Sequence, residues 1–104
     1  MNIGEALNFA SEGHAIRRNC WSGCFIVFKQ IPAIISRDKI STMLSIPEDV
    51  KKLISEFSNK IEYRNQLILF NFHDGVATHY TPDGEDLLED DWEIVDINSY
   101  NPFV

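Results

Sequence analysis

Two strand-like segments, residues 66–72 and 76–80, are separated by the tripeptide His73-Asp74-Gly75. Both segments contain β-branched and aromatic residues, which favour strands. Asp-Gly is a strong hairpin signal because both residues tolerate the positive φ angles that tight turns require. Such a turn pairs its two strands in opposite directions. We therefore expect the sheet of this protein to be antiparallel.

Further strand-like segments lie in the first third of the chain. Residues 14–20 and 24–30 predict two strands, and the turn between them falls at residues 21–23. Residues 33–35 predict an edge strand, because Pro32 lacks the N–H group that a central strand needs. Residues 36–44 carry no strong pattern, and we expect a loop there.

The N-terminal segment predicts a short amphipathic helix at residues 3–12. Asn2 can cap this helix, and Glu5 lies at the reciprocal position of a capping box. Gly13 stands where a glycine commonly ends a helix. The apolar residues recur at helical spacing and form one stripe, made by Ile3, Ala6, Leu7 and Ala10.

A second helix is predicted at about residues 45–58, with Ser45 as its cap, Pro47 in the first turn and Glu48 as the partner of the cap. We expect its apolar stripe to pack on the sheet. A helix that binds a partner protein is the alternative. The stripe comprises Val50, Leu53, Ile54, Phe57 and Ile61.

Near the C-terminus, residues 86–90 predict one helical turn and residues 92–95 a final strand. The complete pattern predicts an α+β fold, with an antiparallel sheet, an N-terminal helix and an inserted amphipathic helix. We expect residues 1–104 to form a single domain, with the helical insertion at about 45–58 and a loosely held tail at 98–104.

The net charge of −7 excludes several classes of partner. Binding to a DNA or RNA polymer, or to an acidic membrane, relies on many Lys and Arg side chains. No segment is long and apolar enough to span a bilayer, and no targeting signal is visible. The two cysteines are compatible with a reducing compartment, so we expect a cytoplasmic protein.

No motif indicates catalysis or a resident metal or cofactor. Cys20, Cys24 and His14 lack the second ligand pair of a structural zinc site, so we interpret the cysteines as packing residues. No nucleophile elbow, phosphate-binding loop or zinc-protease motif is present. A cluster of acidic residues lacks the calcium-loop pattern, and we expect it to be solvated. This cluster comprises Glu85, Asp86, Glu89, Asp90, Asp91 and Glu93.

Arg17, Arg18 and Trp21 form the best candidate for a ligand site. Guanidinium groups bind phosphate, and an indole ring can stack on a nucleobase. Strand alternation places the two arginines on opposite faces, so one of them reaches a given pocket. In the alternative interpretation, Trp21 belongs to the core and the arginines pair with the acidic cluster. The spacing alone leaves both interpretations open.

Three segments resemble the phage Thoeris anti-defence protein family, type two. These segments are the start at residues 1–7, the stretch Ile16-Arg17-Arg18-Asn19-Cys20-Trp21-Ser22-Gly23, and the end at residues 88–95. The resemblance implies a sponge that binds a cyclic nucleotide signal of the glycocyclic ADP-ribose type, or a cyclic dinucleotide, without cleaving it. It also implies a homotetramer with ligand pockets at the protomer interfaces. A protein-binding inhibitor of a host defence protein is the alternative function.

The resemblance also implies site residues. Trp21 and Arg18 match the tryptophan and arginine of the family motif, whereas Cys20 and Ser22 replace a glycine and an asparagine. Residues 39–60 replace a shorter loop of the family. No catalytic residue, metal ligand or cofactor is implied. The expected ligand-binding residues are Arg17, Arg18, Asn19, Trp21, Ser22, Tyr80 and Asp91.

Overall fold

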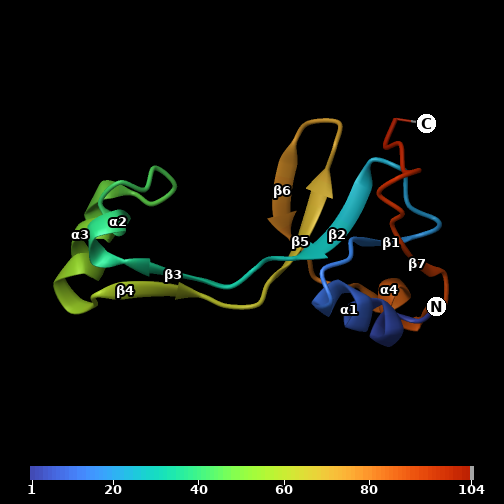
Figure 1. Cartoon of the computed structure of the whole chain (residues 1–104), viewed down its shortest axis with the longest axis horizontal. Coiled ribbons are helices and arrows are strands. Elements are labelled where there is room, and N and C mark those ends of the chain that lie inside the picture. Colours follow the sequence, from blue (N-terminus) through green and yellow to red (C-terminus); the bar gives the residue numbers. More distant parts are fainter. Residues whose placement is uncertain (104) are drawn as a thin grey trace. The chain divides into compact units, whose positions relative to one another are not determined.

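A computed structural model describes residues 1–103, which fall into two compact units. The sheet unit comprises residues 1–30 and 66–103, and the inserted unit comprises Ile31–Asn65. Both units combine antiparallel strands with helices, which confirms the predicted α+β class (Figure 1). No helix within residues 1–103 is long and apolar enough to cross a membrane.

The sheet unit is built on five antiparallel strands in the order β6-β5-β2-β1-β7. The predicted hairpin is confirmed, and its turn uses Gly75 at a φ of +70°. The carboxylate of Asp74 accepts a hydrogen bond from the backbone N–H of Val76. The elements of this unit are α1 (Ile3–Ser11), β1 (Ile16–Arg18), β2 (Phe25–Lys29), β5 (Leu67–Asn71), β6 (Val76–His79), α4 (Gly84–Leu88) and β7 (Trp92–Ile94).

Each of the helices α1 and α4 begins with a capping box. Asn2 and Glu5 form the predicted capping box of α1, and Asp83 and Asp86 form one at the start of α4. Both helices contact each other, and α1 also contacts β1, β2 and β7 (Figure 1). The core lies beneath them and comprises Ala6, Ala10, Ile16, Val27, Tyr80 and Trp92.

The face of the sheet opposite the core is also apolar. Val27 pairs with Leu69 on the core side, so the neighbouring pair of Ile26 and Phe70 points to the other face. Ile26 and Phe70 are both half-buried. Arg17 also lies on that face, because Ile16 beside it belongs to the core. An apolar surface therefore adjoins Arg17.

The inserted unit contains β3 (Ala33–Ser36), α2 (Arg37–Ile40), α3 (Glu48–Phe57) and β4 (Lys60–Tyr63). Its strands β3 and β4 form a separate two-stranded sheet, so the predicted strand after Pro32 exists but pairs within the insertion. The predicted loop at residues 36–44 is wrong in part, because α2 places Ile40 in a fully buried position. The predicted helical insertion at 45–58 thus belongs to a larger compact unit.

Two predictions for α3 are wrong. Its N-cap is Pro47 and not Ser45, and the carboxylate of Glu48 binds the ammonium of Lys51 at 2.9 Å. Most of the apolar stripe is exposed, with Leu53 57% and Phe57 78% exposed, whereas Ile54 and Ile61 are half-buried. Lys51 is the buried residue of α3, and its ammonium donates to Glu48 at 2.9 Å and to the Ser41 carbonyl oxygen at 3.4 Å. Periodicity identified the helix but not the face that it buries.

Candidate functional site

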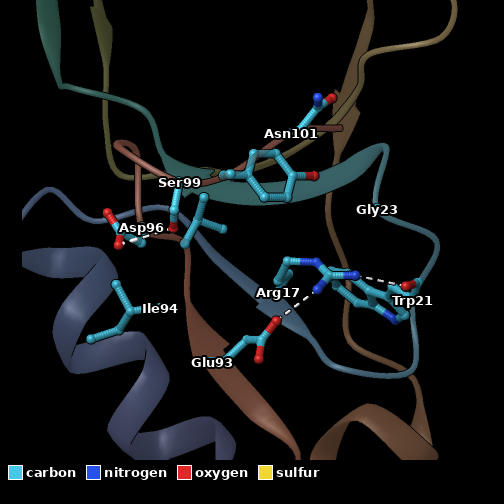
Figure 2. A pocket seen from close by; sticks show the side chains of 10 residues that line it. Arg17, Trp21, Gly23, Glu93, Ile94, Asp96, Ser99 and Asn101 are labelled. Atoms are coloured by element: carbon cyan, nitrogen blue, oxygen red, sulfur yellow. Dashed lines mark hydrogen bonds and ion pairs between the residues drawn. The ribbon is translucent and has the colours of Figure 1, made fainter. Parts of the chain in front are cut away.

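A pocket of about 670 Å³ opens beside β1 and β7 in the sheet unit (Figure 2). Its volume lies within the range of pockets that bind small molecules. The strands supply one wall, the turn after β1 supplies another, and the segment after β7 supplies a third. The lining residues are Arg17, Trp21, Gly23, Glu93, Ile94, Val95, Asp96, Ser99, Tyr100 and Asn101.

Arg17 lies in the middle of the pocket wall, between Glu93 and the turn at Trp21 (Figure 2). Its Nη1 donates to Glu93 Oε1 at 2.6 Å, and its Nη2 donates to the carbonyl oxygen of Trp21 at 2.6 Å. Arg17 and Glu93 are direct partners across β1 and β7, so the register of the sheet creates this ion pair. The terminal nitrogens of Arg17 are therefore engaged by the protein itself.

Two buried polar atoms, on residues that line the pocket, have no hydrogen-bond partner within residues 1–103. They are Arg17 Nε and the hydroxyl oxygen of Tyr100. A buried polar atom without a partner costs about 1–3 kcal/mol, so native proteins seldom retain one without a reason. Both residues line the same pocket, and a ligand that bonds to these two atoms would remove this cost.

The segment after β7 is shaped by Asp96. Its carboxylate accepts hydrogen bonds from the backbone N–H of Asn98 and from the hydroxyl of Ser99, both at 3.0 Å. Its carbonyl oxygen accepts from the backbone N–H of Tyr100 at 2.8 Å. The Tyr100 ring lies 6.1 Å from the Phe72 ring, and burial raises the pKa of Tyr100. This turn brings Tyr100 to the pocket as a protonated phenol at neutral pH.

Trp21 belongs both to the pocket and to the border of the core. Its ring centroid lies 5.3 Å from that of Trp92 and 5.9 Å from that of Tyr80, in edge-to-face arrangements. Such pairs stabilise a fold by about 0.5–1.5 kcal/mol beyond the area that they bury. Trp21 therefore packs against the core and also lines the pocket, so the core and ligand-site interpretations of this residue are compatible.

Arg18 lies on the other face of β1, where it is buried in an ion-pair network. Its Nε and Nη2 donate to the two carboxylate oxygens of Asp91 at 2.8 and 3.3 Å. Its Nη1 donates to Asp86 at 3.0 Å. Glu85 approaches to 3.6 Å from the exposed side. This network is the pairing with the acidic cluster that the sequence offered as an alternative.

The carboxylate of Asp86 connects Arg18 to the core. Tyr80 donates its hydroxyl proton to Asp86 at 2.7 Å, and Trp92 donates its indole N–H to the Asp86 carbonyl oxygen at 2.9 Å. Burial alone would raise the pKa of Asp86, but the hydrogen bonds from Tyr80 and Arg18 outweigh it and lower this pKa below its ordinary value. Burial and the Asp86 carboxylate raise the pKa of Tyr80. Asp86 is therefore ionised at neutral pH and Tyr80 is not.

The structure brings two of the seven expected site residues to the pocket, namely Arg17 and Trp21. Arg18, Tyr80 and Asp91 belong to the buried network described above. The remaining two lie nearby and are exposed: Asn19 donates to Glu93 at 3.3 Å, and the Ser22 hydroxyl lies 3.3 Å from the Cys24 thiol.

Sequence reasoning missed the segment after β7, which contributes Asp96, Ser99, Tyr100 and Asn101 to the pocket. An aspartate followed at the second and third positions by Asn98 and Ser99 is a signal for a local turn. That signal indicates the local turn at residues 96–99. The predicted loosely held tail at 98–104 overlaps this turn, and its last residue lies outside the described part of the chain.

The acidic cluster does not form a uniform solvated face. Asp86 is buried, and the carboxylates of Asp91 and Glu93 each bind an arginine. Within residues 1–103, no group of three His, Cys, Asp or Glu side chains is arranged to hold a metal ion. Four of its six residues pair with the arginines of β1: Glu93 with Arg17, and Glu85, Asp86 and Asp91 with Arg18.

A family model described as the Thoeris anti-defense 2-like domain matches residues 1–95. No curated protein matches the chain. The matched range includes β1, β7 and the buried Arg18 network, but it ends before Asp96. The third wall of the pocket therefore lies beyond the part of the chain that the family model covers.

Proposed function

This chain belongs to the Thoeris anti-defense 2-like family, and from that premise we propose that it is a sponge for a cyclic nucleotide immune signal. The family supports a phage anti-defence role and is consistent with a protein that performs no catalysis. In the proposed mechanism, the protein binds a glycocyclic ADP-ribose isomer or a cyclic dinucleotide and holds it intact. The captured signal cannot reach the host effector in the cytoplasm of the infected bacterium.

The pocket beside β1 and β7 is the proposed binding site. The observation that carries this assignment is that Arg17 and Tyr100 line one pocket of about 670 Å³ and each holds a buried polar atom without a partner within residues 1–103, Nε and the hydroxyl oxygen. Sequestration depends on affinity and slow release, so a pocket with unused hydrogen-bonding capacity and an adjacent Trp21 ring meets its requirements. No bond-breaking step is needed.

We also propose a homotetramer, with the pocket near the contact between protomers. The apolar outer face of the sheet supports this arrangement, because Ile26 and Phe70 lie there next to Arg17. Apolar surface of this kind is typical of a protein–protein interface. Light scattering coupled to size-exclusion chromatography measures the assembly directly, and a monomeric mass at micromolar concentration would contradict the tetramer.

Calorimetric titration with a panel of cyclic ADP-ribose isomers and cyclic dinucleotides tests the sponge. We expect tight binding of at least one compound and, after heat denaturation, recovery of that compound unchanged by chromatography. Asn101→Trp is expected to obstruct the pocket, and Asn98→Trp is the matched control, because Asn98 is exposed on the same segment but does not line the pocket. Absence of binding across the panel would overturn the proposal, and a degraded product would replace the sponge by an enzyme.

A second candidate function is supported by the inserted unit. Val50, Leu53 and Phe57 expose one apolar stripe on α3, and exposed apolar surface commonly marks a protein-binding site. In this alternative, the chain inhibits a host defence protein through α3 and binds no nucleotide. Phe57→Glu would then abolish anti-defence activity in infected cells, whereas it would leave the activity of a nucleotide sponge unchanged.

A further inference from the structure

The polar groups of the pocket indicate which part of a nucleotide it can accept. Phosphate recognition by arginine usually employs two parallel N–H groups of one guanidinium. Both terminal nitrogens of Arg17 already donate to the protein, to Glu93 and to the Trp21 carbonyl oxygen. Nε is the guanidinium nitrogen without a partner within residues 1–103. Each terminal nitrogen keeps a second N–H, but a bidentate contact with phosphate through Nε would have to share a terminal nitrogen that Glu93 or the Trp21 carbonyl oxygen already holds at 2.6 Å.

The charges around the pocket also disfavour phosphate. Among the described residues that line the pocket, Arg17 is the single cationic side chain, whereas Glu93 and Asp96 contribute two carboxylates. The chain as a whole carries a net charge of −7. A phosphate group placed among these side chains would be repelled by the two carboxylates, and the positive charge of Arg17 is already neutralised by Glu93 at 2.6 Å.

The unused hydrogen-bonding groups are those that a neutral ligand would match. Arg17 Nε can only donate, and the protonated Tyr100 hydroxyl can donate as well. The carboxylate oxygens of Glu93 and Asp96 have further lone pairs and can only accept. A ligand surface that suits this site presents a carbonyl oxygen or ring nitrogen beside hydroxyl or amino groups. Nucleobases and ribose carry these groups.

We propose that this pocket binds the uncharged nucleoside part of its ligand and leaves the phosphates outside. A base acceptor receives the hydrogen bonds from Arg17 Nε and Tyr100, and hydroxyl or amino donors of the ligand bind Glu93 and Asp96. The pocket thereby selects a nucleotide by its base and sugar. This inference rests on the proposed function, because it assigns the ligand of the same site.

Titration calorimetry with each common ribonucleoside and its 5′-monophosphate tests this proposal. We expect at least one nucleoside to bind, and its monophosphate to bind no more tightly. Because no phosphate is contacted, the affinity should change less than about twofold between roughly 50 and 500 mM NaCl. Tyr100→Phe should weaken nucleoside binding by about three- to tenfold through the loss of one hydrogen bond. Tyr63→Phe is the matched control, since Tyr63 belongs to the inserted unit, and it should change nothing.

Three results would overturn the inference: no nucleoside binds, a monophosphate binds more than about tenfold tighter than its nucleoside, or the affinity falls steeply with salt. The same titrations with cyclic di-AMP and a cyclic ADP-ribose isomer separate this inference from the proposed function. If those compounds bind but the nucleosides do not, the sponge stands and the inference fails. If the nucleosides bind but the cyclic compounds do not, the inference stands and the sponge fails.

Discussion

The substitution Asp86→Asn tests whether the ion-pair network beneath β1 stabilises the sheet unit. The Asp86 side chain is 10% exposed and accepts from Arg18 at 3.0 Å and from Tyr80 at 2.7 Å. An amide of the same shape retains one acceptor oxygen and places an NH₂ group against one of these donors. Hydrogen bonds to charged groups contribute about 1.5–3 kcal/mol, and breaking a buried ion pair costs about 3–5 kcal/mol. Because Arg18 keeps its ion pair with Asp91, we expect the free energy of unfolding to fall by about 3 kcal/mol.

Urea denaturation followed by tryptophan fluorescence measures this loss, because Trp21 and Trp92 both belong to the sheet unit. The matched control is Asp90→Asn, which makes the same change in charge at a side chain that is 85% exposed. We expect the control to change the free energy of unfolding by less than about 0.5 kcal/mol.

The pH dependence of Asp86→Asn provides a second readout. The pKa of Asp86 is lowered in the folded protein, so its stabilising effect is fully present above the ordinary value of 3.8 and is lost as the pH falls through the folded value. The difference in the free energy of unfolding between wild type and variant should therefore be constant near neutral pH and shrink below about pH 4. The reasoning would be refuted if Asp86→Asn lowered the free energy of unfolding by less than about 1 kcal/mol at neutral pH. It would also be refuted if the difference in this free energy between wild type and variant grew on acidification.

Three further predictions concern the pocket and the inserted unit. Tyr100→Phe removes a buried hydroxyl that has no partner within residues 1–103, so thermal unfolding should show equal or higher stability, by up to about 1 kcal/mol. Trp21→Ala should abolish ligand binding in calorimetry and also cost about 3 kcal/mol in urea denaturation, because the ring packs against Trp92; unchanged affinity would remove Trp21 from the site. Ile40→Ala should reduce hydrogen-exchange protection in α2 and α3 by about 2–4 kcal/mol, whereas Phe57→Ala, at an exposed position, should change it by less than about 0.5 kcal/mol.

Features that depend on interactions between residues close in sequence were predicted from the sequence. The capping box of Asn2 and Glu5 and the turn at Gly75 are as predicted, because their partners lie within three or four residues along the chain. Strand alternation likewise predicted that Arg17 and Arg18 lie on opposite faces, which their separate partners confirm. These features depend on backbone geometry more than on distant contacts.

The partners of charged residues could not be predicted in the same way. Arg18 binds Asp86 and Asp91, which are 68 and 73 residues away in sequence, and the pairing of β1 with β7 brings them together. Sequence reasoning therefore offered two interpretations of the arginines, and the structure shows that both arginines pair with members of the acidic cluster. Arg18 stabilises the fold, and Arg17 faces the pocket.

The sequence by itself determined the α+β class, the antiparallel hairpin and the resemblance that the family match to residues 1–95 confirms. Only the tertiary structure decided that Leu53 and Phe57 of α3 are exposed and that Tyr100 lines a pocket. The physical reason is the range of the interactions concerned. Turns, caps and periodicity depend on neighbours along the chain, whereas burial and the composition of a pocket depend on which distant segments meet.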